Sequence, residues 1–301
     1  MVNYLVGTGG WAYFKVPDKP SLKAYSEIFN FVEVNYTFYE YPTISTVEKW
    51  RRIVPKDFTF SVRCHQDLTH RIGLKQDDGA YEVFYKAKGY ADILQTPYLV
   101  LETPASYTIN SDAKGFLASL NLKGIQLVWE YRAQITPQVT NLMQDFNIVQ
   151  CVDLSLKKPT FYTEVTYSRL FGKGQQNIYQ FTDNELSEIQ RRAEETNSKQ
   201  IILAYHGVRM NGDALRFQQH LKTGDYLPVT SATGADSAKE VLAQDSTFPT
   251  SKAELIKSQG WKVIDVKQNQ TAHLSDFLKR IPDKNYNDLK EVIKELKPVI
   301  G

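Results

Sequence analysis

The sequence predicts an α/β protein that begins with a closed (β/α)8 TIM-type barrel and ends with a small helical extension. Eight short apolar runs, rich in β-branched and aromatic residues, recur along the chain. Amphipathic stretches with helical spacing separate these runs, and the strand signal fades after about residue 230. Alternating strands and helices favour parallel strands joined by helical crossovers, and a count of eight favours a barrel.

The predicted strands and helices alternate in chain order. The strands cover residues 4–7, 31–36, 58–65, 98–102, 125–132, 148–153, 167–171 and 201–206. The helices cover residues 22–29, 47–54, 81–94, 113–120, 136–146 and 184–196. In the last helix Leu186, Ile189 and Ala193 share one side, as an amphipathic helix requires. We expect Thr43 and Asp183 to cap two helices, and the polar residues 71–79 to form an exposed loop.

The C-terminal residues show helical patterns and little strand signal. Ser251 and Glu254 have the spacing of a capping box. Apolar residues recur at helical spacing over 274–281 and again over 289–296. The sequence therefore predicts two parts, a barrel over residues 1–230 and a helical extension over residues 231–301.

Composition limits the class of protein. The hydrophobic share of 42% and the charged share of 23% are those of a globular chain. No apolar run reaches 18 residues and the N-terminus lacks the pattern of a secretory signal, so we expect neither a membrane span nor export. Cys64 and Cys151 lie far apart and form no metal-binding spacing, which favours buried thiols in the cytoplasm. The net charge of +2 does not by itself predict a nucleic-acid partner.

Polar residues converge on the carboxyl-terminal end of the barrel, which we call the mouth. Alternate side chains of a barrel strand point inward, and those near the strand ends line the site. The inward positions near the strand ends hold Glu33, Asn35, Ser61, Arg63, His65, Glu102, Glu130, Arg132, Asp153, Tyr167, Arg169 and His206. Three arginines favour an anionic ligand, because a guanidinium presents a planar fork to phosphate or carboxylate. A buried network of ion pairs without chemistry is the alternative.

Two other kinds of site are less favoured by the residue pattern. Residues 7–12 (GTGGWA) have the spacing of a dinucleotide-binding motif, but no helical pattern follows them, so we expect a tight turn. A catalytic Zn²⁺ or Mn²⁺ is a second possibility. Its possible ligands are Glu102, Glu130, Asp153, His65 and His206. No metal-binding spacing supports it, and the neighbouring arginines would repel a cation, so we expect no metal and no other cofactor.

Motifs at the strand ends resemble the domain-of-unknown-function 72 (YecE-like) family. They are GTGGWAY at residues 7–13, VEVNYTFY at 32–39, FTFS at 58–61, EYR at 130–132 and YSR at 167–169. The resemblance covers about residues 4–220 and implies a TIM-type barrel with no established activity. Glu102, Phe171 and His206 depart from the residues usual in that family. Residues 248–286 resemble a second, small helical family, domain of unknown function 2795.

These observations lead us to expect an enzyme that acts on a phosphorylated or carboxylated substrate at the mouth. Its predicted substrate-binding residues are Trp11, Asn35, Arg63, Glu102, Arg132, Tyr167 and Arg169. Glu130 and Asp153 are the predicted general acid and base, with His65 or His206 as the alternative proton carrier.

Three alternatives stay open. Aromatic residues near the mouth, Trp11, Tyr13, Phe38 and Tyr39, could stack nucleic-acid bases. A metal-dependent phosphodiesterase resembling barrel-type DNA-repair endonucleases is the second alternative. A scaffold whose tail binds a partner is the third. The oligomeric state is left open.

Overall fold

The computed structural model describes residues 2–301, which form two compact units. The first unit runs to Leu170 and includes Arg192–Tyr205, and the second comprises Phe171–Arg191 and His206–Gly301. The first unit holds all eight strands of the main sheet, so it carries the barrel wall and the mouth.

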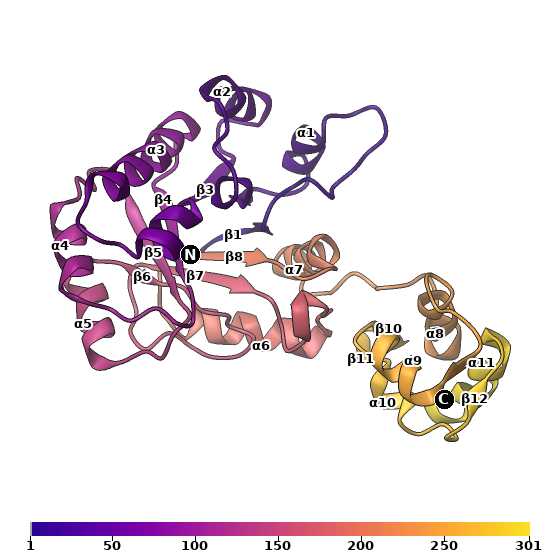
Figure 1. The fold of residues 1–301 in the computed structure, drawn as a ribbon. Helices are drawn as coiled ribbons and strands as arrows, with labels where there is room; N and C mark the ends of the chain where they lie inside the picture. The colour runs from indigo at the N-terminus through magenta and orange to yellow at the C-terminus, as the bar shows by residue number, and fades with distance from the viewer. Residues whose placement is uncertain (1) are drawn as a thin grey trace. The chain divides into compact units, whose positions relative to one another are not determined.

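Eight parallel strands form the barrel (Figure 1). They are β1 (Asn3–Thr8), β2 (Phe31–Val34), β3 (Thr59–Arg63), β4 (Tyr98–Thr103), β5 (Gln126–Tyr131), β6 (Val149–Gln150), β7 (Val165–Leu170) and β8 (Gln200–Tyr205). They pair in the order β6-β5-β4-β3-β2-β1-β8-β7. A parallel bridge between Val152, just after β6, and Ser168 of β7 joins the two ends of the sheet. The predicted barrel and all eight predicted strands are confirmed.

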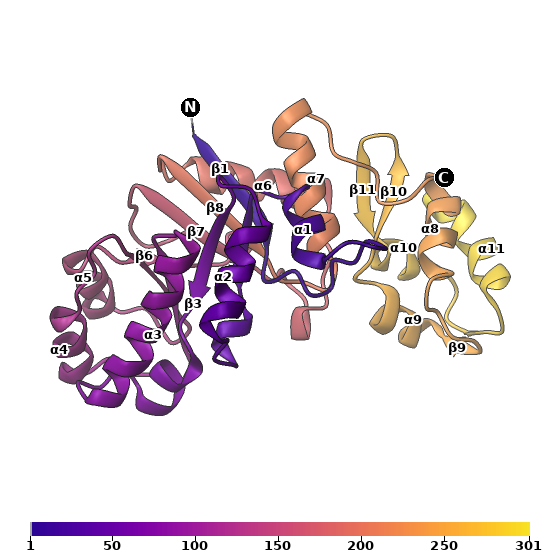
Figure 2. The same ribbon diagram turned by 90° about the horizontal axis from the view of Figure 1, so that it is seen from above.

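Helices cover the outside of the strands in the first unit (Figures 1 and 2). They are α1 (Ser21–Ser26), α2 (Ile44–Ile53), α3 (Asp78–Leu94), α4 (Ser111–Ser119) and α5 (Pro137–Asp145). Every residue of β4 is buried, as is expected of a parallel strand with the barrel interior on one face and helices on the other. Thr43 caps α2 as predicted, because its hydroxyl accepts from the Thr46 backbone N–H.

Two local predictions need correction. Helix α6 (Asp183–Glu194) is capped by Thr182 and not by Asp183. Thr182 Oγ1 accepts from the Glu185 N–H, and the Glu185 carboxylate accepts from the Thr182 N–H, which together form a capping box. The predicted loop over residues 71–79 is ordered at both ends. A π-helix, η2 (Asp67–Ile72), occupies its start, and α3 begins at Asp78.

The glycine-rich residues 7–12 form the predicted turn. No helix begins until Ser21, and Gly10 adopts a φ of 110°, a backbone conformation that favours glycine. Gly7 is required for a different reason. A Cβ at this position would lie 1.9 Å from the backbone oxygen of Phe31, so only glycine allows β1 and β2 to approach this closely.

The second unit contains the last long helix of the barrel sequence and the C-terminal extension. Besides most of α6, its helices are α7 (Met210–Thr223), α8 (Gly234–Leu242), α9 (Lys252–Gln259), α10 (Ser275–Leu278) and α11 (Leu289–Ile300). The residues of the extension bury their own apolar cluster, which includes Leu242, Leu255, Ile264, Leu278 and Leu296. The helical patterns predicted around residues 251, 278 and 293 are confirmed.

The extension also contains strands, which the sequence did not predict. β10 (Val263–Lys267) and β11 (Gln270–His273) form an antiparallel hairpin, and β9 (Thr250–Ser251) pairs with β12 (Asn285–Tyr286). The hairpin turn includes Asn269 with a φ of 58°, a conformation that asparagine tolerates well. These strands are too short to produce a clear period of two in the sequence.

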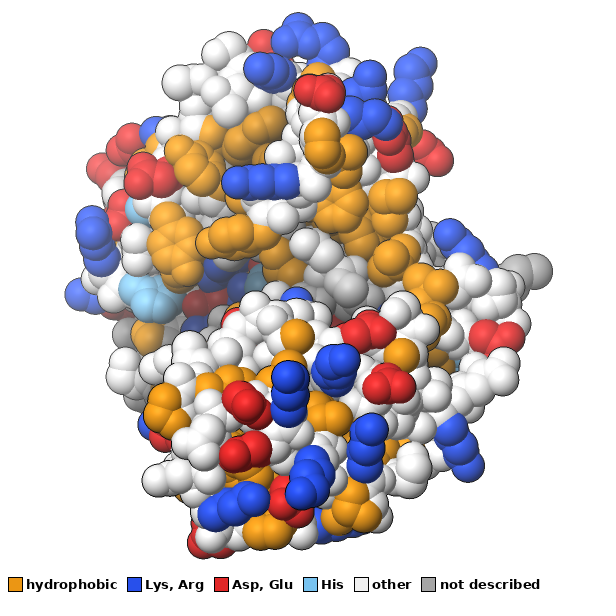
Figure 3. Space-filling view, turned by 90° about the vertical axis from the view of Figure 1, so that its right-hand side faces the viewer, with side chains coloured by type: hydrophobic (Ala, Val, Ile, Leu, Met, Phe, Trp, Pro, Cys, Tyr) orange, Lys and Arg blue, Asp and Glu red, His pale blue; other side chains and the backbone are white. Residues whose placement is uncertain are grey.

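The surface is chemically mixed. Figure 3 shows basic, acidic and hydrophobic side chains interspersed over the elements of the C-terminal extension, in keeping with the small net charge. None of the helices formed by residues 2–301 is long and apolar enough to cross a membrane.

Candidate functional site

The barrel interior holds an apolar cluster, and the charged residues lie toward the mouth. The cluster consists of Leu5, Phe31, Tyr98, Val100, Val128, Val149, Cys151, Tyr167, Ile202 and Ala204. Arg63 is the last residue of β3, and Glu102 and Glu130 occupy paired positions just before the ends of β4 and β5. Parallel strands end at the same side of a barrel, so these distant residues meet there.

The most deeply buried carboxylate of the site is that of Glu33. The Tyr167 hydroxyl donates to Glu33 Oε2 over 2.8 Å, and Ser61 Oγ lies 2.7 Å from the same hydroxyl. Burial, and then the charge of Glu33, raises the pKa of Tyr167 well above its usual value. The phenol therefore stays neutral and acts as a hydrogen-bond donor to Glu33.

Arg169 connects three glutamates. Its Nε lies 3.1 Å from Glu33 Oε1, and its Nη1 donates to both Glu102 and Glu130. Burial alone would lower the pKa of Arg169, but the three carboxylates raise it well above the usual arginine value. Arg169 is thus a permanently charged centre that holds carboxylates from β2, β4 and β5 together.

Arg63 lies beside Arg169 and is almost as deeply buried. Its Nη2 donates to Glu102 and its Nη1 to the amide oxygen of Asn35. Its guanidinium carbon lies 3.8 Å from the ring centre of Phe38, a cation–π contact. Burial and repulsion by Arg169 lower the pKa of Arg63. Asn35 and Phe38 therefore belong to the support of this arginine.

Arg132 is the solvent-facing member of the network. Its Nε lies 2.7 Å from Glu130 Oε1 and its Nη1 lies 3.0 Å from Glu102 Oε1, yet 41% of its side chain is exposed. Burial would raise the pKa of Glu130, but the charges of Arg169 and Arg132 outweigh burial and lower it to about 2. Glu130 is consequently ionised at neutral pH.

Six charged side chains from five strand ends thus form one network. Three carboxylates face three guanidinium groups, so the charges balance. The members are Glu33, Arg63, Glu102, Glu130, Arg132 and Arg169. Balance of this kind lowers the cost of burying charge, and it leaves Arg132 as the guanidinium most accessible to a ligand.

His65 lies in a separate group beside the network. Its ring stacks on Tyr41 with 4.0 Å between ring centres, and its Nδ1 lies 3.0 Å from Asp67 Oδ2. The Tyr41 hydroxyl donates to the same carboxylate oxygen over 3.0 Å. Asp67 therefore fixes both rings, and the His65 side chain is almost fully buried.

His70 was not among the predicted site residues, but it lies within electrostatic reach of the network. It is exposed, it packs edge-on against Phe38 at 5.3 Å, and its Nδ1 lies 2.9 Å from Thr69 Oγ1. Burial of part of the ring is the main cause that lowers the pKa of His70. Glu102 opposes this effect, while Arg132 and Arg63 add to it.

Three other predicted residues have local contacts outside the network. Asp153 Oδ1 accepts from the backbone N–H and the hydroxyl of Ser155, and so caps a turn after β6. Trp11 packs edge-on against Trp50 with 5.2 Å between ring centres. His206 follows β8, belongs to the second unit, and stacks on Phe171 at 4.8 Å.

Several carboxylate and imidazole side chains near the mouth are of the types that bind metal ions. In the described part of the chain, residues 2–301, no group of three or more His, Cys, Asp or Glu side chains is arranged to hold a metal ion. The three glutamates of the network are instead bound by arginines.

Comparisons with known proteins agree with this architecture. A DUF72 family protein from Enterococcus faecalis V583 is 12% identical, with a TM-score of 0.60, and the match covers 74% of this chain and 98% of that one. A DUF72 family protein from Thermotoga maritima MSB8 is 19% identical, with a TM-score of 0.58, over 73% and 99% of the two chains. Likeness at this level shows the fold alone. No curated protein matches the chain.

The family model covers the barrel sequence and ends just after it. It matches residues 5–233, so helices α8 to α11 lie beyond it. The likeness of residues 248–286 to the second helical family stays a prediction. The resemblance inferred from the strand-end motifs is confirmed, and the chain belongs to the family described as protein of unknown function DUF72.

Proposed function

We propose that this protein is an enzyme that acts on a small phosphorylated or carboxylated substrate at the barrel mouth. The observation that carries the proposal is the position of Arg132. Its guanidinium is paired with the carboxylates of Glu102 and Glu130, yet 41% of the side chain is exposed. A guanidinium oriented in this way can present a planar fork to an incoming carboxylate or phosphate.

The other two arginines have a different role in this proposal. Arg63 and Arg169 are almost completely buried, and apart from Arg63 Nε their described donors contact Glu33, Glu102, Glu130 and Asn35. They act as positioning residues that hold the glutamates, and the glutamates in turn orient Arg132. A site held by packed and mostly paired neighbours is preorganised, which limits the reorganisation needed during the reaction.

We assign the proton transfer to His70. Glu130, with a pKa of about 2, carries no proton at neutral pH and is a weak base. The lowered pKa of His70 keeps its imidazole neutral at pH 7, and the exposed ring is free to meet a substrate. A neutral imidazole close to an anion-binding guanidinium is suited to general base catalysis. Asp153 and His65 then support the local structure.

Binding of simple anions tests the first part of the proposal. Inorganic phosphate and malonate are titrated into the wild-type protein and into Arg132→Gln by calorimetry. The variant should bind about tenfold more weakly or worse, equivalent to about 1.4 kcal/mol. Arg52→Gln, at an exposed position in α2, is the matched control and should bind like the wild type. Equal binding by Arg132→Gln would contradict the assignment.

Turnover tests the second part. With p-nitrophenyl phosphate as a probe, His70→Gln should lower kcat by about 10²- to 10⁴-fold while phosphate binding is retained. Unchanged turnover in this variant would remove His70 from the reaction. Bis(p-nitrophenyl) phosphate, assayed with EDTA and with Mn²⁺, separates this mechanism from a metal-dependent phosphodiesterase.

Nucleic-acid binding is a second candidate function, and exposed aromatic rings favour it. Tyr36 is 52% exposed and packs edge-on against Trp50, which also contacts Trp11. Such rings can stack single-stranded bases. Quenching of tryptophan fluorescence by short oligo-dT and oligo-rU, measured at low and high salt, would support this function. Binding that is absent or insensitive to salt would argue against it.

A further inference from the structure

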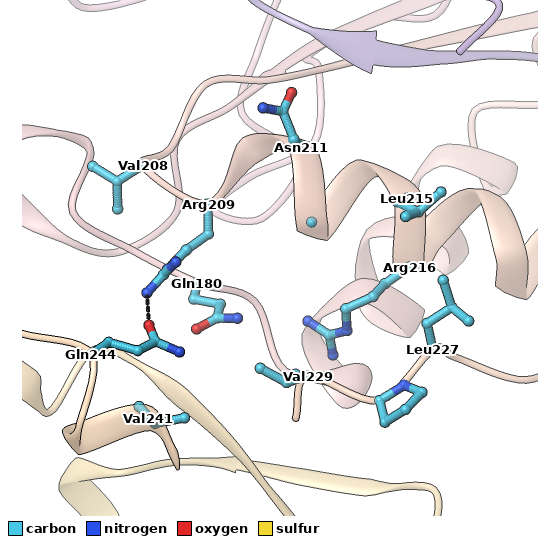
Figure 4. Close-up of a pocket in the computed structure, with 12 residues that line it drawn as sticks. Gln180, Val208, Arg209, Asn211, Leu215, Arg216, Leu227, Val229, Val241 and Gln244 are labelled. Atoms are coloured by element: carbon cyan, nitrogen blue, oxygen red, sulfur yellow. Dashed lines mark hydrogen bonds between the residues drawn. The ribbon is translucent and has the colours of Figure 1, made fainter. Parts of the chain in front are cut away.

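A cavity of about 350 Å³ lies within the second unit, beside the first turn of α7 (Figure 4). About half of its wall is apolar, and this half is formed by Val208, Leu215, Leu227, Pro228, Val229 and Val241. A volume of this size suits a small organic molecule with one ring. The barrel-mouth network lies in the other unit, so this cavity is a separate feature of the chain.

Most polar side chains of the cavity present hydrogen-bond donors, whereas Asn211 carries a buried amide oxygen without a hydrogen-bond partner. Arg209 Nη2 donates to the Gln244 amide oxygen over 2.6 Å, and the Gln180 amide oxygen accepts from the Val263 N–H over 3.0 Å. The side-chain oxygens of Gln180 and Gln244 thus already accept hydrogen bonds. Their amide NH₂ groups remain to donate to a ligand. In Figure 4 the guanidinium groups of Arg209 and Arg216 turn toward the space beside Gln180. None of the residues that line the cavity is acidic.

Arg216 supplies an independent indication of a ligand. Arg216 is only 4% exposed. Its two terminal nitrogens donate to the Phe181 carbonyl and to the carboxylates of Asp213 and Asp183. Its Nε–H is buried and has no hydrogen-bond partner. A buried donor without an acceptor is unfavourable and rare, and an acceptor on a bound ligand would satisfy it.

The first turn of α7 supplies backbone donors, and it also contains the buried Asp213, which is paired with Arg216. Arg209, Asn211 and Gly212 line the cavity, and no side chain caps this end of the 14-residue helix. Uncapped N–H groups and the helix dipole both favour a negative charge at a helix start. The helix start therefore reinforces the two arginines.

We propose that this cavity binds a small organic anion, in which a carboxylate or phosphate group is attached to an apolar body. The anionic group binds the donors of Arg209 and Arg216 and the first turn of α7, and the body contacts the apolar wall. Val241 and Gln244 lie beyond residue 233, where the family match ends. The site is thus completed by the C-terminal extension, and ligand binding joins the extension to α7.

Two variants test the site by different means. Gly212 lines the cavity, and a Cβ there would meet no atom within 4 Å. Gly212→Leu therefore fills the cavity without removing charge, and it also favours the helix. Gly89→Leu is its control, because Gly89 lies in α3 with the same open surroundings. Arg209→Gln removes one charge, with Arg52→Gln as its control.

The probes are mandelate and phenyl phosphate, with neutral 1-phenyl-1,2-ethanediol for comparison, and calorimetry measures the affinity. At least one anion should bind the wild type, and Arg209→Gln should weaken it tenfold or more. Gly212→Leu should abolish binding, while Gly89→Leu, Arg52→Gln and the barrel-mouth variant Arg132→Gln should retain it. Preference for mandelate or for phenyl phosphate identifies the anionic group.

Three results would overturn the proposal. They are failure of both anions to bind the wild-type protein, equally tight binding of the neutral diol, and undiminished binding by Gly212→Leu. Loss of binding in Arg132→Gln would likewise place the probe at the barrel mouth and not in this cavity. A failure here leaves the proposed enzyme function standing, because the two sites share no residue.

Discussion

Arg169 Nε lies 3.1 Å from Glu33 Oε1, and both side chains are almost completely removed from solvent. The two residues come from β7 and β2, which are 136 positions apart in the chain. Such a pair is costly to bury, and its attraction offsets this cost only when the remaining donors and acceptors are satisfied. The Tyr167 hydroxyl donates a second hydrogen bond to Glu33. Arg169 in turn donates to the carboxylates of Glu102 and Glu130.

The first prediction is that Arg169→Met strongly destabilises the fold. The substitution keeps much of the side-chain volume but leaves Glu33 and Glu102 buried with fewer charge partners. Breaking a buried ion pair from one side costs about 3–5 kcal/mol. Urea denaturation at pH 7 measures the loss.

The matched control for this experiment is an exposed pair. Lys199 and Glu164 also form an ion pair, but about three quarters of each side chain is exposed. Lys199→Met should cost only about 0–1 kcal/mol. If the two substitutions cost the same, the buried network contributes no more than a surface contact.

The second prediction concerns the stability of the fold at acid pH. The pKa of Glu130 is about 2 in the folded protein and about 4.3 in an unfolded chain. A lowered pKa means that the stabilisation is present above about pH 4 and is lost as the pH falls toward 2. Glu130→Gln should therefore be less stable than the wild type at pH 7, by an amount on the order of 3 kcal/mol.

The pH dependence of the stability difference tests whether ionisation of Glu130 is its cause. The difference between the wild type and Glu130→Gln should shrink steadily in urea melts from pH 5 to pH 2. Glu164→Gln, at an exposed position, should follow the wild-type curve throughout. A difference that stays constant with pH would mean that ionisation of Glu130 does not stabilise the fold.

Much of the charged network could be predicted from the sequence, because strands have a period of two. In β3, Phe60 and Val62 alternate with Ser61 and Arg63, so the inward set follows from the apolar set. The same alternation places Glu33 in β2. The contacts themselves could not be predicted, because they depend on the relative register of strands that are far apart in the chain.

Other features had no usable signal in the sequence. His70 was missed because it lies on the π-helix η2, which has neither of the common periods. The cavity beside α7 was missed because Arg216, Gln180 and Gln244 come from three separate segments. The strand β11, which ends at His273, was missed because a four-residue strand is too short to show a period.

The third prediction concerns the titration of His70. Its pKa should lie below 6.5, because burial disfavours the charged ring and Arg132 and Arg63 repel it. Arg132→Gln removes one of these cations and should raise the pKa, whereas Glu102→Gln removes an attractive carboxylate and should lower it further. The ring signals in ¹H–¹⁵N NMR spectra report these shifts. If neither substitution shifted the pKa of His70, the ring would not be coupled to the network.

The fourth prediction uses Asp213, which is buried next to Arg216 in the second unit. Burial raises the pKa of Asp213 to about 7, and Arg216 offsets this only in part. Because the folded pKa lies above the unfolded value of about 3.9, the folded protein holds this proton more tightly. The stabilisation is complete below about pH 4 and declines as the pH rises toward 7.

Asp213→Asn removes the ionisable group but keeps an acceptor for the Phe181 N–H, which Asp213 binds over 3.3 Å. Urea melts of the variant should depend less on pH between 4 and 7. At pH 8 it should be more stable than the wild type by about 1–4 kcal/mol, since each unit of pKa corresponds to about 1.36 kcal/mol. Asp225→Asn, at an exposed position, is the control and should leave the curve unchanged. If Asp213→Asn is instead less stable at pH 8, the ion pair with Arg216 outweighs the cost of burying the carboxylate.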